Sequence, residues 1–521
     1  MPGLDQDVIK LINPKRALGR INTDVQTDFI LAPHYSVIYA HAGDDLWEIL
    51  KEPLSSGRYE PELPITIDVP KKSGLTRPGS ILSPLDRLLY QALVDLIGPT
   101  AESQLDRSRV FSNVLLKRDP LFHMFEPSYV SWRKFNHAIT TNCKDPNQKY
   151  AIKADISSFF ERLYQHILIN LLHAGECSPK VVNLLEKLML AWMEKDSHGI
   201  LQGMYPSDFL GNFYLCGLDS ELTDRSIPSA RYVDDLYLFF PSVDEARSGL
   251  VDLCRILRNE GLHLNESKTC IIESEKLLRE ESELDRMFEQ AREEIEGGLE
   301  IQDIYGFVHI WNPERDEELT EEDVELQAVE ALYNKIGEVS GAQEEKIERF
   351  CLPILSAAGS SLAVDRTLDG ICVRPHLSQL YCSYLVRLIS SNPDIGKKLE
   401  AYVLKASLPY DWQMMWCIAA LIEAKSVSTS TISTVFNVLR STSRSVSLRA
   451  LCAILIGKHG APARRHNLRN HYSDEPSPYV RSAILFASKY FPTQERKTCL
   501  SVWKGHSPIN SLIAKAVGVI T

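Results

Sequence analysis

Hydrophobic and polar positions follow two different patterns along this chain. From about residue 75 to 275, short runs of alternating apolar and polar residues are mixed with helical stretches and separated by turn residues, which predicts strands and helices together. After about residue 320, apolar residues recur at helical spacing and predict helices alone. We therefore expect an α+β part followed by an all-α part.

Three apolar helical stretches recur in the last third of the chain, at residues 413–421, 448–455 and 480–485. Recurrence at this length is typical of stacked helix pairs, in which each repeat buries its apolar face on its neighbours. The pattern therefore predicts a HEAT-like helical repeat, with a non-repetitive helical bundle as the alternative.

The net charge of −12 is distributed unevenly. Residues 273–348 contain 25 acidic and 7 basic residues, so the rest of the chain carries a charge of +6. Within this acidic segment, residues 304–311 predict an isolated strand. Residues 458–504 contain nine Lys or Arg and three acidic residues, which suits either a phosphate-binding face or a solvated helix surface. Because the acidity is local, nucleic acid is not excluded as a partner.

Cysteine usage and hydropathy indicate the compartment. Eleven cysteines are scattered from Cys143 to Cys499 without a Cys-x-x-Cys pair, which is typical of reduced, buried thiols rather than a zinc site. No apolar run reaches the about 18 residues that a membrane helix needs, and the start of the chain has no apolar signal-peptide core. We expect a cytoplasmic protein that does not enter a membrane.

Two carboxylates lie at the predicted tip of a β-hairpin. Strand-forming runs at 230–233 and 236–240 flank the sequence Tyr232-Val-Asp-Asp, which places Asp234 and Asp235 in the connecting turn. The hairpin therefore presents two oxygen ligands at one point of the predicted sheet.

Asp155 lies 79 residues upstream of this turn, at the end of another predicted strand. A helix is predicted to follow, with Ser158 and Glu161 as its capping box and Leu171 on its apolar face. A carboxylate at a strand end can face outward from the sheet, although a simple turn or cap aspartate is the structural alternative.

Nucleotidyl transfer uses two divalent ions about 4 Å apart, bridged by carboxylates on adjacent strands. Asp155 and Asp234 meet this requirement, with Asp235 as an additional ligand or polar neighbour. Oxygen ligands without nearby His or Cys favour Mg²⁺ over zinc, and Mn²⁺ can replace Mg²⁺ at such a site.

Further motifs accompany these carboxylates in a definite order. Gln202-Gly203 lies between Asp155 and the hairpin, and the residues 265–269 follow it. With Asp155 as motif A, Gln202-Gly203 as motif B, 232–235 as motif C and 265–269 as motif D, the chain resembles a reverse transcriptase over about 200 residues. Residues 77–91 resemble the finger segment that precedes these motifs.

The resemblance implies a role for each matching residue. Asp155, Asp234 and Asp235 become the metal-binding catalytic carboxylates. Lys268 becomes the group that protonates or steadies the pyrophosphate, or else a solvated turn lysine. Phe160 matches the steric gate that excludes a ribose 2′-hydroxyl, with a core helix position as its alternative. The residues implied to contact the nucleotide are Phe160, Gln202, Gly203 and Tyr232.

Motif B would line both the nucleotide and the template strand, where Gly203 permits close backbone approach. Two departures from the family pattern argue against ordinary template handling: Leu201 replaces the usual proline, and Met204-Tyr205 replaces small residues. No basic thumb helices directly follow motif D.

Among reverse transcriptases, the architecture most resembles the bacterial abortive-infection group. The resemblance divides the chain into fingers and palm with an N-terminal segment (1–275), an acidic connection (276–345) and a HEAT-like helical domain (346–521) in place of a conventional thumb. It implies a phage-defence polymerase of the bacterial cytoplasm that makes single-stranded DNA from dNTPs without a template. A protein hydroxyl primes synthesis, a closed homo-trimer or homo-hexamer forms, and a phage component acts as trigger. Twenty tyrosines leave the priming residue open.

Two alternatives remain. A template-copying, retron-like reverse transcriptase would bind a specific RNA and show a basic cleft contiguous with Arg107, Arg109, Lys117 and Arg118. A non-catalytic protein would use its helical repeats to bind a partner, but three mutually repelling carboxylates have no physical reason to persist in such a relic.

Overall fold

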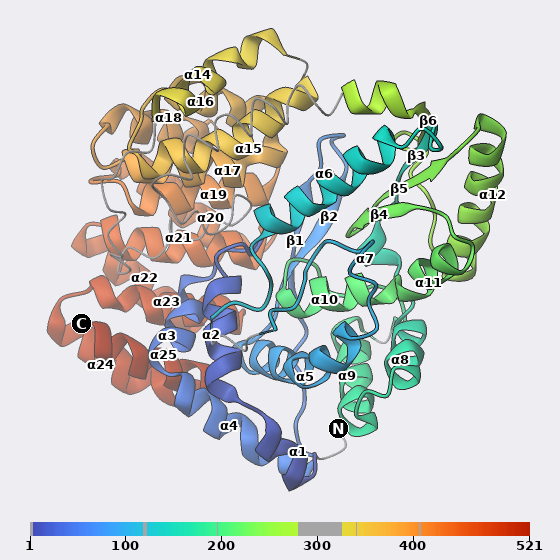
Figure 1. Ribbon diagram of the computed structural model, residues 1–521. Helices are drawn as coiled ribbons and strands as arrows, with labels where there is room; N and C mark the ends of the chain where they lie inside the picture. The colour runs from blue at the N-terminus through green and yellow to red at the C-terminus, as the bar shows by residue number, and fades with distance from the viewer. Residues whose placement is uncertain (1–3, 118–121, 195, 280–325, 340, 406–407) are drawn as a thin grey trace.

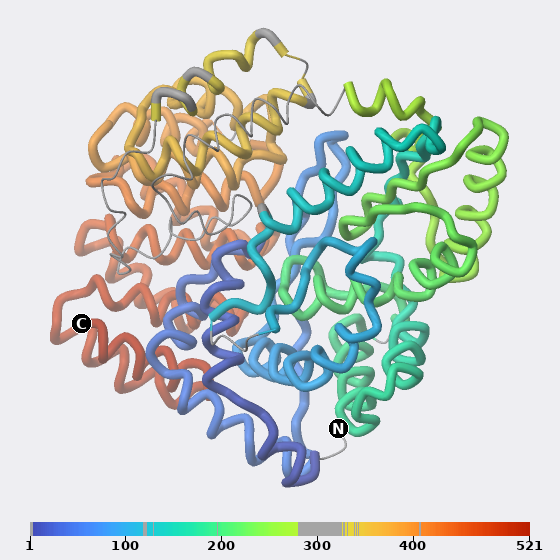
Figure 2. Tube along the Cα trace, in the orientation of Figure 1, coloured from blue at the N-terminus to red at the C-terminus, as the bar shows by residue number. Residues whose placement is uncertain are grey.

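The computed structural model describes residues 4–117, 122–194, 196–279, 326–339, 341–405 and 408–521. In Figure 1 the four strands β3 to β6 lie on one side of the molecule and the C-terminal helices on the other. Figure 2 shows that the first helices lie beside the last ones. Helices α3 (Pro33–His41) and α4 (Gly43–Ser56) contact α25 (Pro508–Ile520). The N-terminal segment therefore joins the two halves of the chain.

A four-stranded antiparallel sheet forms the centre of the α+β half, in the order β4-β5-β3-β6. Asp155 ends its strand as predicted, and β4 and β5 form the predicted hairpin. Its connecting residues are Val233 and Asp234, so Asp235, which was predicted to lie in the turn, is instead the first residue of β5 and pairs with Tyr232. The four strands are β3 (Tyr150–Asp155), β4 (Ser229–Tyr232), β5 (Asp235–Phe240) and β6 (Cys270–Glu273).

Alternation along β5 buries both faces of this sheet. Tyr237 and Phe239 join the apolar cluster under α6 (Ser128–Lys144), whereas Leu238 and Phe240 join the main core. On that core side, α12 (Val243–Asn259) contacts β3 and β5. Because successive strand residues point to opposite faces, the sheet is held between helices and its end is left to present the carboxylates.

The helix after Asp155 is shorter than the sequence predicts. The α7 helix covers only Phe159–Arg162, and Ser158 has a φ of 50° without a side-chain cap, so the capping box with Glu161 is wrong. The Gly199 N–H donates to the Leu163 carbonyl at 2.8 Å. In a continuing helix the Leu163 carbonyl would accept a hydrogen bond from the N–H four residues later. Here the N–H of the distant Gly199 takes that place, and the helix ends.

A separate two-stranded hairpin, β1 (Ile65–Pro70) and β2 (Thr76–Ile81), stands beside the palm, with Val69 paired to Arg77. In Figure 1 this hairpin lies between the palm and the C-terminal helices. The other helices of this half are α1 (Gln6–Leu11), α2 (Pro14–Asp24), α3 (Pro33–His41), α4 (Gly43–Ser56), α5 (Pro84–Glu102), α8 (Gln165–Ala174), α9 (Pro179–Trp192), α10 (Tyr205–Tyr214) and α11 (Cys216–Asp224).

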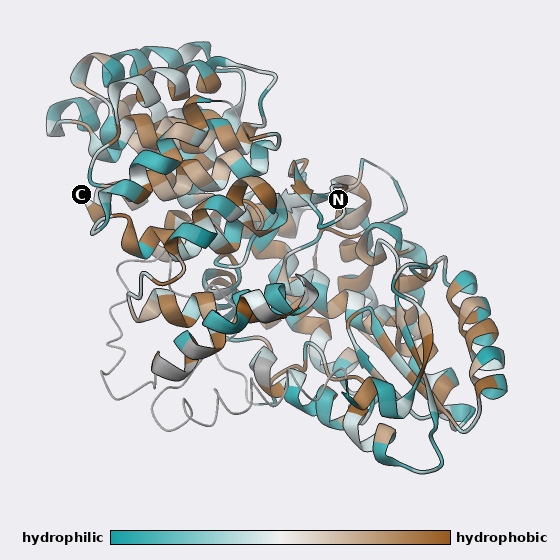
Figure 3. Cartoon of the chain, turned by 90° about the horizontal axis from the view of Figure 1, so that it is seen from above, coloured by the Kyte–Doolittle hydropathy of each residue, from teal (hydrophilic) through white to brown (hydrophobic). Residues whose placement is uncertain are grey.

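The described residues from 326 onward form only helices, which confirms the all-α prediction for them. The odd-numbered helices from α15 to α25 form a row in which each helix contacts the next odd-numbered one. Within this row α19 is buried over nearly its whole surface, as expected for a helix that is apolar all round. Figure 3 shows hydrophobic residues inside this stack and hydrophilic residues on its outer helices. The helices are α14 (Leu326–Asn334), α15 (Gly341–Ala357), α16 (Val364–Val373), α17 (Ser378–Leu388), α18 (Pro393–Leu404), α19 (Asp411–Ile422), α20 (Thr429–Arg440), α21 (Val446–His459), α22 (Pro462–Asp474), α23 (Pro478–Ala487), α24 (Thr493–Trp503) and α25 (Pro508–Ile520).

Predictions for an isolated strand, the cysteines and membrane helices have different outcomes. The strand expected at 304–311 lies outside the described residues. All eleven cysteines are free, and seven are buried as predicted, but Cys216 and Cys254 are half-buried, and Cys270 and Cys372 are exposed. Within the described ranges, no helix has the length and apolarity needed to cross a bilayer.

Candidate active site

The three predicted carboxylates meet at one end of the palm sheet. Asp155 and Asp235 are direct partners across β3 and β5. Asp234 occupies the adjoining turn, where its carbonyl accepts a hydrogen bond from the Ile156 N–H at 3.3 Å. Asp155 is 8% exposed, Asp234 is half-buried and Asp235 is exposed. The sheet register thus brings together residues that are 79 positions apart in the sequence.

The negative charge of this cluster is only partly compensated. Burial, followed by the charges of Asp235 and Asp155, raises the pKa of Asp234 to about 7. Carboxylates crowded in this way gain from a bound cation, and an all-oxygen donor set suits Mg²⁺ or Mn²⁺. The described residues contain no group of three Asp, Glu, His or Cys side chains already arranged as a metal site. The chemistry of the carboxylates fits a divalent cation, but their side chains would have to rearrange to bind it.

Both carboxylate oxygens of Asp155 have partners within the protein. The Lys268 ammonium lies 2.6 Å from Oδ1, and the Asn265 side chain donates to Oδ2 at 3.0 Å. Burial lowers the pKa of Lys268, but the hydrogen bond and charge of Asp155 outweigh it, so the pKa is raised. Lys268 is therefore a protonated partner of Asp155 here. Asn265 opens motif D in the sequence, but its contact with Asp155 was not predicted.

The turn that carries Asp234 is held in an unusual conformation. Val233 has a φ of 55°, which is rare for a β-branched residue and persists only where the surroundings enforce it. Its N–H donates to the Ser112 hydroxyl at 2.8 Å, and its carbonyl accepts from Arg231 at 3.1 Å. These two contacts fix the peptide groups directly before Asp234.

Arg231 is the centre of this support. It is 1% exposed and forms a two-point ion pair with Asp219 at 2.9 and 2.5 Å. It also donates to the Asn212 side chain at 2.8 Å, and Asn212 in turn donates to the Ser112 carbonyl at 2.9 Å. Sequence analysis did not identify these four residues, although an arginine directly before Tyr232 was an available signal.

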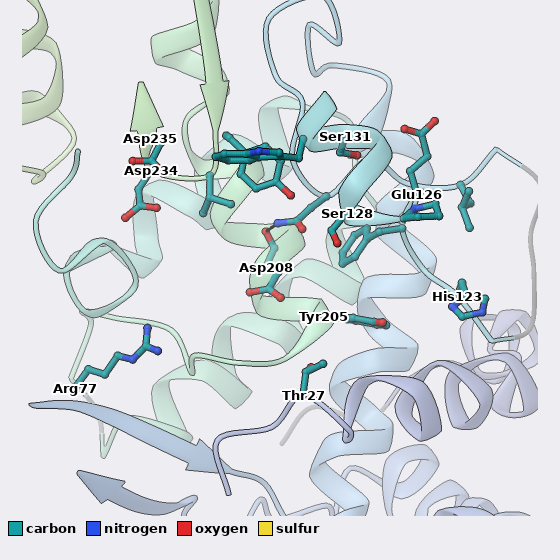
Figure 4. Close-up of a pocket in the computed structure, with 17 residues that line it drawn as sticks. Thr27, Arg77, His123, Glu126, Ser128, Ser131, Tyr205, Asp208, Asp234 and Asp235 are labelled. Atoms are coloured by element: carbon teal, nitrogen blue, oxygen red, sulfur yellow. Dashed lines mark hydrogen bonds between the residues drawn. The ribbon is translucent and has the colours of Figure 1, made fainter. Parts of the chain in front are cut away.

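A cavity of about 710 Å³ opens beside the hairpin, a size within the range of ligand pockets. Tyr232, Asp234 and Asp235 form one wall, and Trp132 and Tyr205 lie on the others. Figure 4 shows Asp234 and Asp235 at one end and the helix that carries Ser128 and Ser131 at the other, with Asp208 between them. The cavity therefore extends from the carboxylates toward α6 and α10.

Arg77 from β2 lines the same cavity, across from Asp234 in Figure 4. Its guanidinium lies 4.4 Å from the centre of the Phe29 ring. Burial and the charge of Arg349 lower the pKa of Arg77, and Asp234 acts in the opposite direction. Within the described part of the chain Arg77 has no hydrogen-bond or ion-pair partner, and its Nε is buried. A cation in this position suits an anionic ligand such as a phosphate.

Motif B is covered by the chain itself. Gly203 has a φ of 84°, and a Cβ at this position would lie 3.0 Å from two carbons of the Phe29 ring. Gln202 is half-buried, and its Oε1 has no partner among the described residues. The glycine thus permits close approach as predicted, but the group that approaches is Phe29.

Phe160 lies beside α10 rather than in the wall of the cavity. Its ring packs against Phe159, with the ring centres 5.2 Å apart. A Cβ at Gly211 would lie 2.8 Å from Phe160 Cε1. Because Gly211 has no side chain, it leaves room for the Phe160 ring in this position. The role of Phe160 as a sugar gate stays a prediction.

A buried charge cluster anchors the N-terminal segment under the cavity. Arg87 binds Asp24 at 2.5 Å and Asp28 at 3.0 Å. Burial, followed by the charge of Asp24, raises the pKa of Asp208 to about 8, and Asp208 lines the cavity. Arg87 belongs to the predicted finger segment, but no sequence signal identified its partners.

Of the four basic residues expected to border the cleft of an RNA-binding alternative, Arg107 and Arg109 have partners within the protein, whereas Lys117 is exposed. Arg107 binds Glu102 at 2.5 Å and donates to backbone carbonyls. Arg109 binds Asp106 at 3.4 Å and Ser229 at 3.0 Å. Both side chains thus hold local structure together. Arg118 lies outside the described residues.

Comparison with known proteins identifies the part of the chain that holds this site. Residues 69–284 match the family described as "Reverse transcriptase (RNA-dependent DNA polymerase)". The chain contains a reverse transcriptase domain. This domain includes β2 to β6 and all three carboxylates, and it implies nucleotide polymerisation, for which polymerases of this family generally use divalent metals.

The relatives of this reverse transcriptase domain are distant. Protein YkfC of Escherichia coli K12 is 25% identical over 216 residues, which cover 39% of this chain and 52% of YkfC. The match therefore spans about half of the length of that curated relative.

Solved structures with similarity include telomerase from Candida tropicalis in complex with a TWJ fragment of telomeric RNA, at 12% identity and a TM-score of 0.33. That match covers 72% of this chain and 68% of the telomerase chain. Apo telomerase from the same organism matches at 11% identity with a TM-score of 0.32, over 91% and 73% of the two chains.

Proposed function

We propose that this protein is a DNA polymerase that adds dNTPs with two Mg²⁺ ions at Asp155, Asp234 and Asp235. The sheet register carries this proposal, because it places Asp155 opposite Asp235 with Asp234 in the adjoining turn. When bound, such ions activate the attacking hydroxyl and neutralise the triphosphate. Mn²⁺ is the expected substitute. Arg77, which has no hydrogen-bond or ion-pair partner in the described part of the chain, is positioned to bind the triphosphate oxygens.

The remaining predicted residues receive supporting roles in this proposal. Lys268 holds Asp155 and stays protonated, so it is also a candidate to stabilise the leaving pyrophosphate. Tyr232 packs its ring edge-on against Trp132, with the centres 5.1 Å apart, and thereby shapes the cavity wall. Phe160 is the proposed sugar gate, and Gln202 the proposed nucleotide contact in motif B.

The proposed synthesis does not copy a template. A template strand along motif B would need the face of Gly203, and the Phe29 ring covers that face. Arg107 and Arg109, which would line a basic template cleft, bind groups of the protein instead. Met204 and Tyr205 in place of small residues support the same interpretation.

The resemblance to abortive-infection reverse transcriptases extends the proposal. It adds a phage trigger, a HEAT-like domain at residues 346–521 after a 1–275 catalytic part, and a homo-trimer or homo-hexamer. It also adds a protein hydroxyl as primer, so that the single-stranded DNA product stays attached. Residues with hydroxyl side chains line the cavity, among them Ser128, Ser131 and Tyr205.

The experiment that tests template use is synthesis by the purified full chain with Mg²⁺ and labelled dNTPs, with no template or primer. Products are separated on denaturing gels before and after protease treatment. Label that migrates with the protein until protease releases it supports protein-primed, untemplated synthesis. Label that needs added RNA template and primer contradicts it and favours the retron-like alternative, and absence of label under both conditions favours the non-catalytic one.

A further inference from the structure

Phe29 lies between the C-terminal helices and the candidate active site. Its carbonyl accepts a hydrogen bond from the Trp412 indole N–H of α19 at 2.7 Å. Its ring supports the Arg77 guanidinium, whose carbon lies 4.4 Å from the ring centre. The ring also lies against Gly203 of motif B. Phe29 therefore contacts the C-terminal helices, the β1–β2 hairpin that carries Arg77, and motif B of the reverse transcriptase domain.

The backbone around Phe29 is fixed from two directions. The preceding carbonyl, of Asp28, accepts from the Gln379 side chain of α17 at 3.2 Å. The Asp28 carboxylate is bound by Arg87 of α5 at 3.0 Å. Trp412 is buried, so the segment cannot shift without breaking contacts on both sides.

The C-terminal helices also contact the tip of the β1–β2 hairpin, which carries Arg77. Lys72 lies 3.5 Å from Glu345 of α15, and the Tyr410 hydroxyl donates to the Gly74 carbonyl at 3.1 Å. Helix α19 contacts β1 directly. The C-terminal helices thus restrain the hairpin at its tip and, through Phe29, at the side chain that faces the cavity.

We propose that Phe29 and Trp412 are positioning residues for Arg77, so that the C-terminal helices set the nucleotide affinity of the reverse transcriptase domain. This inference rests on the proposed function, because it takes the nucleotide triphosphate as the ligand of Arg77. Arg77 has no other partner among the described residues that would hold its long side chain over the cavity. Without the Phe29 ring, the nucleotide would have to order that side chain on binding, which weakens affinity.

The test measures dNTP binding to the full-length protein by titration calorimetry, using a dNTP with a non-hydrolysable α,β-methylene bridge and Mg²⁺. Phe29→Ala is expected to weaken binding about tenfold, the size of one cation–π contact of about 1.4 kcal/mol. Trp412→Phe keeps the buried ring, removes the N–H donor, and is expected to weaken binding less. In steady-state incorporation, both variants raise KM and change kcat less than twofold.

Two comparisons separate positioning from general damage. Trp503→Phe is the matched control. Trp503 lies in the same group of helices and stacks on Tyr472, with the ring centres 3.9 Å apart, and its substitution is expected to leave nucleotide affinity unchanged. In an Arg77→Ala background, Phe29→Ala is expected to have no further effect, because it acts through the missing side chain. Thermal melting confirms that each variant is folded.

The outcomes distinguish this inference from the proposed function. Folded Phe29→Ala and Trp412→Phe variants that bind the nucleotide as wild type does would overturn the positioning role alone. An equal loss from Phe29→Ala with and without Arg77 would also overturn it. Wild-type protein that binds no dNTP would overturn the proposed function, and this inference with it.

Discussion

The Lys268 ammonium lies 2.6 Å from Asp155 Oδ1, at a carboxylate proposed to bind Mg²⁺. A cation bound to a metal ligand competes with the metal. We therefore expect Lys268→Ala to lower the Mg²⁺ concentration required for half-maximal incorporation by several-fold. Because the leaving pyrophosphate loses its nearby cation, kcat is expected to fall by about 100-fold. Incorporation rates across a Mg²⁺ titration measure both effects, and a higher Mg²⁺ requirement in the variant contradicts this account.

Phe160 and Gly211 define the second prediction. Phe160→Ala is expected to admit ribonucleotides, because it removes the ring proposed to exclude the 2′-hydroxyl. Gly211→Ala places a Cβ 2.8 Å from the present position of Phe160 Cε1, and is expected to displace the ring and change sugar selectivity in a folded protein. The ratio of kcat/KM for dNTP and rNTP measures the change.

If that ratio is unchanged in both variants, the gate lies elsewhere. Phe436→Ala, in the C-terminal helices, removes a ring of the same type outside the reverse transcriptase domain and is the matched control.

Ser112 tests the support of the metal-binding turn. Ser112→Ala leaves the Val233 N–H without its acceptor, at a position where φ is already unfavourable. We expect a loss of about 1–3 kcal/mol in stability and a fall in kcat of about tenfold or more, because Asp234 is displaced. Thermal melting and incorporation rates check these values. Ser108→Ala, which loses only a local bond to Asp106, is the control, and equal activity of the two variants would exclude the positioning role.

The buried cluster predicts the pH dependence of stability. Burial raises the pKa of Asp208 to about 8 and that of Asp28 to about 7, both above the usual 3.8. The folded state therefore binds more protons than the unfolded state between about pH 4 and pH 8, and stability falls as pH rises across that range and levels off above it.

Asp208→Asn removes one of these groups while retaining its shape. Relative to wild type, its melting temperature is expected to be higher at pH 9, with a difference that shrinks toward pH 6. A difference that is constant with pH would show that Asp208 is ionised throughout. Melting curves at four pH values decide between the two.

The parts of the site that were predictable are those with local sequence patterns. Alternation around Asp234 and Asp235 predicted the hairpin, and the strand ending at Asp155 was correctly located. The divalent-metal chemistry that these oxygen ligands favour stays a prediction. The all-α part followed from helical periodicity, because it depends on residues close together in the chain.

The parts that were not predictable depend on long-range contacts. The helix after Asp155 breaks because Gly199 binds the Leu163 carbonyl, and no local signal encodes that bond. Likewise, the contact of Trp412 with Phe29 joins residues more than 380 positions apart. Arg77 could be assigned to the finger segment, but only the structure shows that its side chain lines the cavity and that, among the described residues, it packs on the Phe29 ring without a hydrogen-bond or ion-pair partner.

The most direct test of the central claim is Mg²⁺-dependent dNTP incorporation by wild type, Asp234→Asn and Asp252→Asn. Asp252 is a surface aspartate of α12 that binds Arg225, so its variant controls for the loss of one carboxylate charge. We predict incorporation by wild type and Asp252→Asn, and at least 1,000-fold less, roughly the loss of one metal ion's contribution, by Asp234→Asn. Incorporation by Asp234→Asn at the wild-type rate would contradict the assignment of this site.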